Sequence, residues 1–308
     1  MRLVTYSAAG HPRLGAMLHE RTIVDLNRAS GGKLPADMVA FLNAGADAMA
    51  IARTTLDAAR AAGNAGASAT GIIYSLDVPG TRLEAPVPRP PKVLGIGLNY
   101  RDHADEGGQE IPKHPVVFAK MPTCIVGPGV PVHRPRVSAT VDWEGELCIV
   151  IGEPGRHIAA VDAPAHVAGY MNGNDVSVRE WQFHSPTWMI GKSFDTHGPI
   201  GPWLVTADEV NATNLDVKTF VNGQLMQDSN TKHLIFGVGE IIEYLSTSFT
   251  LEPGDVIFTG TPAGVGVARK PPVFLKDGDV VRVEISGLGV LENPVIDEPG
   301  LVAARSPA

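Results

Sequence analysis

The sequence has little cysteine, no excess of basic residues and no long uninterrupted hydrophobic run. Its two cysteines, Cys124 and Cys148, belong to no CxxC or Cys/His cluster, so no disulfide framework is predicted, which fits a reducing compartment. With 25 basic and 33 acidic residues the formal net charge is −8, whereas nucleic acids and anionic membranes need a basic surface. No stretch approaches the roughly 18 uncharged apolar residues of a membrane span, and the N-terminus lacks the apolar centre of a secretory signal. We therefore expect a cytoplasmic protein that binds neither nucleic acid nor membrane.

A run of prolines divides the chain of 308 residues. The segment "APVPRPPKV", residues 85–93, cannot be helical and is stiff, so we place a domain boundary near residue 88, between residues 1–88 and 89–308. Before it, "RLVTY", "GAMLHE" and "TIVDL" predict short strands, and the Ala-rich residues 35–63 predict two helices broken near Gly45. The first region is thus expected to be a small β/α domain.

Strand signals dominate the second region. They are "KVLGIGL", "PVVFAK", "ELCIVIG", "VKTFVNG", "DVIFTG", "DVVRVEIS" and "GVLENPV". Residues 162–171 and 235–248 predict helices, the second with Ile241, Ile242 and Leu245 on one face. Many short strands with Gly/Pro turns and few helices indicate an α+β, β-rich fold. The last residues, 300–308, are expected to fray.

Three acidic residues stand at every second position of "VDWEGELCIVIG", residues 141–152. Because alternate residues of a strand share a face, Asp142, Glu144 and Glu146 are expected to point the same way. The five apolar residues that follow show no alternation, so the strand is expected to be buried on both faces. Buried carboxylates repel one another unless a cation lies between them, and oxygen ligands suit Mg²⁺, Mn²⁺ or Ca²⁺. We favour a metal site over the alternative, a solvent-exposed strand face.

Asp175, within "GYMNGNDVSVREWQ", is the candidate for a third ligand. It lies in a polar cluster that follows the predicted helix of residues 162–171. Asn, Gly and Asp are also the ordinary residues of turns, so this segment taken alone indicates no more than a turn.

His103 and Glu106 form a candidate acid–base pair in "GIGLNYRDHADEGGQE". Residues three apart share a face of a short helix, and a carboxylate beside an imidazole can orient it and raise its basicity. The alternative is an incidental pair on a solvated turn. The glycines and polar residues that follow suggest a mobile lid over residues 103–112. The glycines of "GIGLNY" do not complete a dinucleotide fingerprint, because Tyr100 occupies the third glycine position.

Lys192 and the Gly-rich residues 259–266 are two further candidates for the site, and each also has a purely structural explanation. Lys192 is flanked by apolar residues and glycine in "WMIGKSFDTHGP", and a buried lysine would need an anionic partner, although most lysines lie on the surface. The Gly-rich residues 259–266 follow a predicted strand and could contact an anion through backbone N–H groups, or could form a simple tight turn. They lack the GK[ST] ending of a phosphate-binding loop.

In this order, the segments resemble the fumarylacetoacetate hydrolase family over roughly residues 92–296. The matching stretches are "GLNYRDHADE", "PVVFAK", "VDWEGELCIVIG", "GYMNGNDVSVREWQ", "GKSFDTHGPIGPWLVT", "VNGQLMQDSNT", "EIIEYLS", "LEPGDVIFTGTPAGVG" and "GDVVRVEISGLGVLENPV". The resemblance implies a mixed β-roll whose C-terminal domain carries the active site. It also implies a homodimer that acts on a small-molecule oxo acid.

The resemblance implies a role for each matching residue. The metal ligands are Glu144, Glu146 and Asp175, with Mg²⁺ or Mn²⁺ as the ion. The catalytic residues are His103, Glu106 and Lys192. The residues that contact substrate are Arg179, Gln182 and Thr261. Asp142 stands where relatives carry an acid that is not a ligand, and we leave it out of the metal site.

The implied activity is that of a metal-dependent hydrolase. It would cleave a carbon–carbon bond of an acylpyruvate or other 1,3-diketo acid through a metal-bound enolate, with His103 taking a proton from water. The same enolate would arise in a decarboxylase of an oxaloacetate-type 2-oxo acid, and an isomerase of a 2-hydroxy-dienedioate would need the same metal. These alternatives stay open, and we expect the hydrolase. A binding protein on this scaffold would not need the pair of His103 and Glu106.

The segment before Lys192 departs from the family pattern. Phe183, His184, Trp188 and Met189 bring bulky side chains close to the predicted site. They predict a pocket that is larger and more apolar than one for a small dicarboxylate. The alternative is ordinary packing in the core or at a dimer interface.

Overall fold

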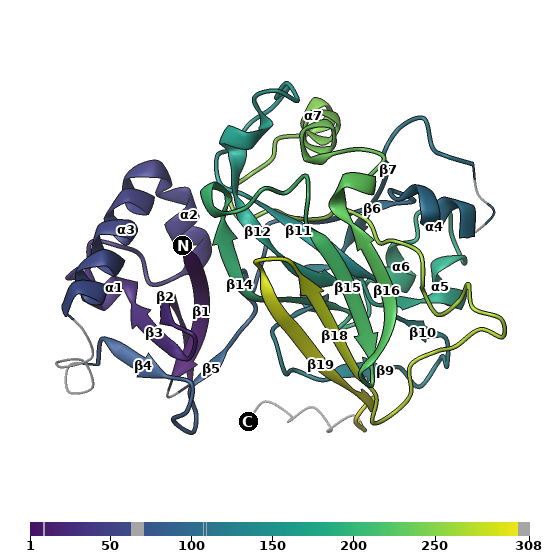
Figure 1. Cartoon of the computed structure of the whole chain (residues 1–308), viewed down its shortest axis with the longest axis horizontal. Coiled ribbons are helices and arrows are strands. Elements are labelled where there is room, and N and C mark those ends of the chain that lie inside the picture. Colours follow the sequence, from purple (N-terminus) through teal and green to yellow (C-terminus); the bar gives the residue numbers. More distant parts are fainter. Residues whose placement is uncertain (9, 63–70, 107, 109, 301–308) are drawn as a thin grey trace, which may run out of the picture.

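A large mixed β-sheet runs through the molecule, with a smaller sheet packed on it (Figure 1). The computed structural model describes residues 1–8, 10–62, 71–106, 108 and 110–300, with the backbone alone at residues 104 and 105. Within these residues twelve strands belong to the large sheet and five to the smaller one. The predicted frayed tail, apart from Gly300, lies outside the described residues, and so does part of the predicted lid; both stay predictions.

The strands of the large sheet do not follow one another in chain order. The order along the sheet is β4 (Ile73–Ser75), β3 (Thr22–Asp25), β2 (His11–His19), β1 (Arg2–Ala8), β14 (Gly198–Thr206), β12 (Val167–Asn174), β11 (Gly145–Ile151), β17 (Val256–Phe258), β6 (Val93–Gly97) and β7 (Val116–Lys120). Off this path, β5 (Arg82–Leu83) pairs with β1 and β8 (Ile125–Val126) pairs with β14. The β6–β17 and β8–β14 pairs are parallel and the other pairs antiparallel, so the sheet is mixed.

The remaining strands form the smaller sheet and a short ribbon. The smaller sheet has the order β16 (Gln224–Asn230), β15 (Asp216–Val221), β18 (Val280–Ile285), β19 (Gly289–Asp297) and β9 (Val132–Arg134). The ribbon pairs β10 (Val141–Asp142) with β13 (Ser177–Val178). The predicted β-rich α+β fold is therefore confirmed.

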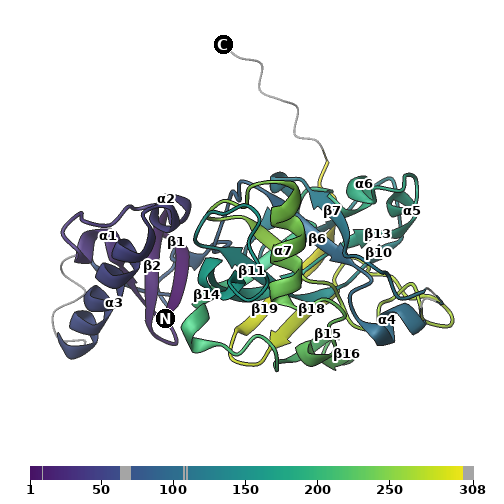
Figure 2. The same cartoon turned by 90° about the horizontal axis from the view of Figure 1, so that it is seen from above.

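The helices lie around the sheets, and α3, with 18 residues, is longer than the other described α-helices (Figures 1 and 2). They are α1 (Leu26–Ala29), α2 (Met38–Asn43), α3 (Gly45–Ala62), α4 (Arg101–Glu106), α5 (Arg179–Gln182), α6 (Met189–Lys192) and α7 (Val238–Ser248). The predicted break near Gly45 is confirmed: Gly45 begins α3 with φ of 70°, a backbone conformation that glycine adopts without strain. None of the described helices is long and apolar enough to cross a membrane.

Strand β11 is buried along its whole length because both of its faces are covered. Cys148 and Val150 point into one hydrophobic core, which includes residues of α2 and α3. Leu147, Ile149 and Ile151 point into a second core, which includes residues of α7, β15 and β18. This explains why its sequence shows no alternation of polar and apolar residues.

Two predictions about elements are wrong. Residues 162–171 are not a helix: a 3₁₀ turn at Ala163–His166 leads directly into β12, whose residues pair with β11 and β14. Sheet pairing overrides the helical periodicity there. Residues 141–152 are not one strand, because the chain leaves β10 at Asp142 and enters β11 at Gly145. Asp142 therefore does not share a strand face with Glu144 and Glu146.

The first 88 residues join the rest of the chain through the large sheet. Strand β1 pairs with β14 through Arg2 and Leu3. One hydrophobic core combines side chains from both regions, among them Leu3, Phe41, Val150 and Phe258. The boundary near residue 88 stays a prediction.

Candidate active site

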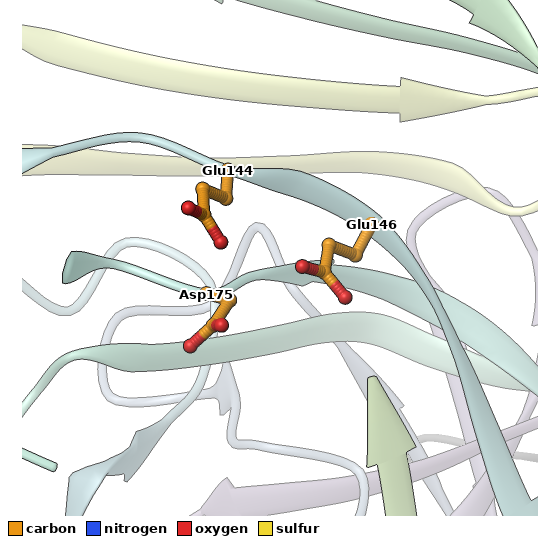
Figure 3. A group of neighbouring side chains, drawn as sticks. All are labelled: Glu144, Glu146 and Asp175. Atoms are coloured by element: carbon orange, nitrogen blue, oxygen red, sulfur yellow. The ribbon is translucent and has the colours of Figure 1, made fainter. Parts of the chain in front are cut away.

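Three buried carboxylates converge where β11 and β12 meet (Figure 3). The antiparallel register sets Glu146 opposite Gly173 and Gly145 opposite Asn174, so Asp175, the next residue, lies beside Glu144. The Asp175 N–H donates to the Glu144 carbonyl at 2.9 Å, and the Glu144 N–H donates to Asn174 Oδ1 at 3.0 Å. One carboxylate oxygen from each of Glu144, Glu146 and Asp175 lies within 4.8 Å of the others.

Three buried cations surround these carboxylates. Lys192 Nζ donates to Glu144 Oε2 at 2.6 Å and to Asp175 Oδ2 at 2.7 Å. Lys120 Nζ donates to Asp175 Oδ1 at 2.5 Å. Arg179 donates to Glu144 Oε1 at 2.6 Å. All three side chains are almost fully buried, so these ion pairs are shielded from water.

The pKa values of Glu144 and Glu146 are shifted in opposite directions. Burial alone would raise the pKa of Glu144, but the charges of Lys192 and Arg179 outweigh burial and hold that pKa well below its usual range. Burial raises the pKa of Glu146 far above its usual range, and the negative charges of Asp175 and Glu144 raise it further. Among the described residues, the Glu146 carboxylate accepts one hydrogen bond, from the Gly260 N–H at 2.7 Å.

The donor set fits a divalent metal ion. Four buried acids, Asp142, Glu144, Glu146 and Asp175, face three buried bases, Lys120, Arg179 and Lys192. The excess negative charge falls on Glu146, which lacks an ammonium or guanidinium partner within the described part of the chain. Carboxylate oxygens from three side chains are the ligands that Mg²⁺ and Mn²⁺ prefer. The buried triad, the set that the family resemblance implied, could therefore hold a divalent ion.

Asp142 supports the site without belonging to the triad. Its carboxylate accepts a hydrogen bond from Arg179 Nε at 2.8 Å. It also accepts hydrogen bonds from the N–H groups of Gly266 and Val267, at 2.7 and 2.9 Å. It thereby fixes the guanidinium that holds Glu144 and ties the loop of residues 259–266 to β10. Arg179 also donates to Gln182 at 3.0 Å.

A cavity of about 340 Å³ opens beside the triad. It brings together most of the residues predicted for the site. Those that line it are His103, Glu106, Glu144, Glu146, Arg179, Gln182, Lys192 and Thr261. Asp175 does not line it: both of its oxygens face the two lysines. Thr261 donates to the Gly145 carbonyl at 3.0 Å and accepts from Gln227 at 2.7 Å.

His103 and Glu106 lie on one face of α4, as predicted. His103 Nδ1 is 3.7 Å from Glu106 Oε2, which is an ion-pair distance rather than a hydrogen bond. Glu106 accepts a hydrogen bond from the Gly264 N–H at 3.0 Å, so the Gly-rich loop holds this carboxylate near the imidazole. Burial would raise the pKa of Glu106, but His103 and the Gly264 N–H outweigh it and lower that pKa.

Lys120 is a charged residue of the site that was not predicted from the sequence. It ends β7, and its ammonium donates to Asp175 and to the carbonyls of Lys192 and His197, the last at 3.1 Å. All three of its donors are therefore used. Burial would lower the pKa of Lys120, but the Asp175 carboxylate outweighs burial and raises it. A lysine that ends the otherwise apolar "PVVFAK" was the available signal.

Comparison with known proteins identifies the family. Residues 92–296 match the family model described as fumarylacetoacetate (FAA) hydrolase, C-terminal. The chain is 43% identical over 302 residues to the protein named oxaloacetate tautomerase fahd2, mitochondrial, of Xenopus laevis, covering 96% of this chain and 90% of that one. The chain belongs to the fumarylacetoacetate hydrolase family and is an enzyme of that family.

Solved structures share the whole fold. A putative HpcE protein from Mycobacterium smegmatis superposes with a TM-score of 0.81 at 35% identity. A 5-carboxymethyl-2-hydroxymuconate delta-isomerase from the same organism superposes with a TM-score of 0.75 at 32% identity. Each comparison covers 97% of this chain and 100% of the other.

Proposed function

We propose that this enzyme moves a proton on a small 2-oxo acid, interconverting its keto and enol forms, in a reaction that depends on a divalent metal. The observation that carries the proposal is the cavity in which an imidazole, His103, and an ammonium, Lys192, face the same space as Glu144 and Glu146. The names of a tautomerase relative and an isomerase neighbour, both proton-transfer enzymes, support it.

Each residue has a proposed role in this reaction. Glu144, Glu146 and Asp175 would hold Mg²⁺ or Mn²⁺, which as a Lewis acid would favour negative charge on the 2-oxo oxygen. His103 would take the proton from the carbon next to the carbonyl. The electron pair of the broken C–H bond would form the carbon–carbon double bond, and the π electrons of the carbonyl would move onto its oxygen. Lys192 would supply a proton to the carbonyl oxygen.

The other predicted residues would position the catalytic groups or contact the substrate. Glu106 would orient the His103 imidazole. Arg179 would fix Glu144, because its guanidinium is already paired with Asp142 and Glu144. Gln182 and Thr261, which also line the cavity, would contact the substrate.

Hydrolysis of an acylpyruvate is the second candidate. It is favoured by the carboxylate of Glu106 beside His103, an arrangement that suits the activation of water. The hydroxide would add to the distal carbonyl, and the bond between that carbonyl and the next carbon would break. Proton transfer needs no such water, so the two candidates differ in whether a carbon–carbon bond is cleaved.

The test follows oxaloacetate and acetylpyruvate side by side with metal-stripped and Mg²⁺- or Mn²⁺-reloaded enzyme. We expect metal-dependent loss of enol absorbance and exchange of C3 hydrogen for deuterium without cleavage. His103→Gln should lower this rate by about 10²–10⁴-fold. His114→Gln, an exposed histidine outside the cavity lining, is the matched control.

Three other outcomes would change the assignment. Cleavage of acetylpyruvate to pyruvate and acetate, lost in His103→Gln, would establish the hydrolase. Carbon dioxide release from oxaloacetate would establish the decarboxylase alternative. Exchange that is unaffected by metal removal would contradict the proposal.

The homodimer and the cytoplasmic location stay predictions. The tautomerase relative carries the word mitochondrial in its name.

A further inference from the structure

One wall of the active-site cavity is aromatic and apolar. Phe118, Phe183 and Trp188 line it together with Ile96 and Val265. Phe183 is 63% exposed, which places its ring at the cavity mouth, whereas Phe118 and Ile96 are buried. This wall has no function in the proton transfer proposed above.

Two glycines of β6 provide the surface on which the rings lie. A Cβ on Gly97 would lie 2.2 Å from an atom of the Trp188 ring, and one on Gly95 would lie 2.2 Å from an atom of the Phe118 ring. The two rings lie 5.9 Å apart, tilted by 55°. Any side chain at 95 or 97 would displace a ring, so the "GIG" segment, which carries no dinucleotide site, shapes this wall.

The backbone of Trp188 is strained. Its φ is 58°, in the left-handed region that a bulky residue rarely adopts. Such strain persists only where the surrounding structure imposes it, and it is found most often at functional sites. The strained backbone places the indole ring against Gly97 and into the cavity lining.

The wall offers no charge for a second carboxylate. Among the described residues that line the cavity, the permanently cationic side chains are Arg179 and Lys192. Both are already ion-paired: Arg179 with Asp142 and Glu144, and Lys192 with Glu144 and Asp175. His103, the remaining basic group, faces Glu106. A carboxylate buried against the wall would therefore be unpaired, which is unfavourable.

We propose that the preferred substrate is a 2-oxo acid with an unbranched apolar tail in place of a second carboxylate, and that Trp188 is the residue that selects the tail. The inference rests on the proposed function for the anchoring of the 2-oxo acid end. It extends that function by naming the other end of the molecule.

The test is a calorimetric binding series on the Mg²⁺-loaded enzyme, which needs no turnover. The probes are pyruvate, 2-oxopentanoate and 2-oxoheptanoate, with 2-oxopentanedioate as the dicarboxylate that matches 2-oxopentanoate in length. We expect Kd to fall by about fourfold for each added methylene. We expect 2-oxopentanedioate to bind at least about tenfold more weakly than 2-oxopentanoate.

Variants assign the effect to the ring. Trp188→Gly removes the ring and suits the left-handed backbone; it should abolish the dependence on chain length and leave the Kd of pyruvate within about twofold. Trp188→Phe should keep part of the dependence. Trp203→Phe, in β14 and outside the cavity lining, is the control and should behave as wild type.

The outcomes that would overturn this inference differ from those that would contradict the proposed function. A Kd independent of chain length, tighter binding of 2-oxopentanedioate, or an equal loss for pyruvate and 2-oxoheptanoate in Trp188→Gly would overturn the inference. A chain-length dependence in an enzyme without proton transfer on any of these acids would uphold the inference and contradict the proposed function. Failure of all four acids to bind would overturn both.

Discussion

At the scale of single residues, the site is a balance of buried charges. Asp142, Glu144 and Asp175 are paired with Lys120, Arg179 and Lys192, and Glu146 is left as the acid whose charge needs an ion. The spacing of the acids in "VDWEGEL" predicted a cluster of buried carboxylates, although not on one strand, and the set of Glu144, Glu146 and Asp175 was implied by the family resemblance. The counter-ions were not predictable in the same way, because Lys120 and Arg179 reach the acids only through tertiary packing.

Lys120→Met tests this balance. The change removes the buried ammonium from Asp175 Oδ1 and from the carbonyls of Lys192 and His197, and leaves Asp175 with Lys192 as its remaining cation, so we expect a loss of about 3–5 kcal/mol in the free energy of unfolding. Urea unfolding monitored by circular dichroism measures it. Lys276→Met, an exposed lysine, is the control and should change stability by less than about 0.5 kcal/mol. Equal losses of unfolding free energy in the two variants would contradict a stabilising role of the Lys120 hydrogen bonds.

We expect the buried His197 to make the stability of the protein depend on pH. It is fully buried, and burial lowers its pKa to about 3. In the unfolded chain His197 therefore takes up a proton near pH 6.5, whereas in the folded chain it takes up that proton only near pH 3. Stability contributed by neutral His197 is present above pH 6.5 and is lost as pH falls through this window, by up to about 1.4 kcal/mol per unit.

His197→Gln should make the fall of unfolding free energy between pH 6.5 and pH 4 shallower. Glutamine keeps a donor for the His133 carbonyl, which lies 2.7 Å from His197 Nε2, and does not titrate. His11→Gln, at an exposed position, is the control. An unchanged slope in His197→Gln would show that this histidine does not carry the effect.

At the scale of elements, the positions of α5 and α6 set the position of Lys192. Gly191 packs against α5, where an added Cβ would lie 2.2 Å from the Gln182 backbone nitrogen. The periodicity of the sequence predicted α7 and strands such as β6, β7 and β18, because it agrees with their burial. It predicted a helix at residues 162–171, where pairing with neighbouring strands overrides a helical pattern, and one strand over residues 141–152, which the structure divides. It predicted no strand for β14.

Gly191→Ala should push α6 away from α5 and displace the Lys192 ammonium. We expect a loss of about 1–3 kcal/mol in unfolding free energy together with at least about tenfold weaker pyruvate binding by the metal-loaded enzyme. Gly237→Ala is the matched control, since its φ is −73° and its Cβ would meet nothing closer than 3.7 Å. Unchanged pyruvate binding in Gly191→Ala would contradict the role of this contact.

At the scale of the whole molecule, the sequence composition changes at the proline-rich segment, but one hydrophobic core contains residues from both sides of it. The family resemblance, confirmed over residues 92–296, allowed the fold to be predicted, and most of the residues it implied for the site line one cavity. The sheet that continues from β1 into β14 was not predictable, because strand pairing between distant segments leaves no local signal.

A fragment of residues 89–308 should be less stable than the full chain. Its β14 would lose the β1 partner and expose both an unpaired edge and apolar side chains such as Leu204. We expect one calorimetric transition for the full chain and a lower transition temperature or aggregation for the fragment. A fragment as stable and monomeric as the full chain would show that the two regions are independent.

The central claim is that Glu144, Glu146 and Asp175 hold a divalent ion, and titration of metal-stripped protein with Mn²⁺ tests it most directly. The account predicts one ion per chain, with binding at least about a hundredfold weaker in Glu146→Gln and unchanged in the exposed control Glu153→Gln. Absence of binding in the wild type, or equal binding in Glu146→Gln, would contradict it.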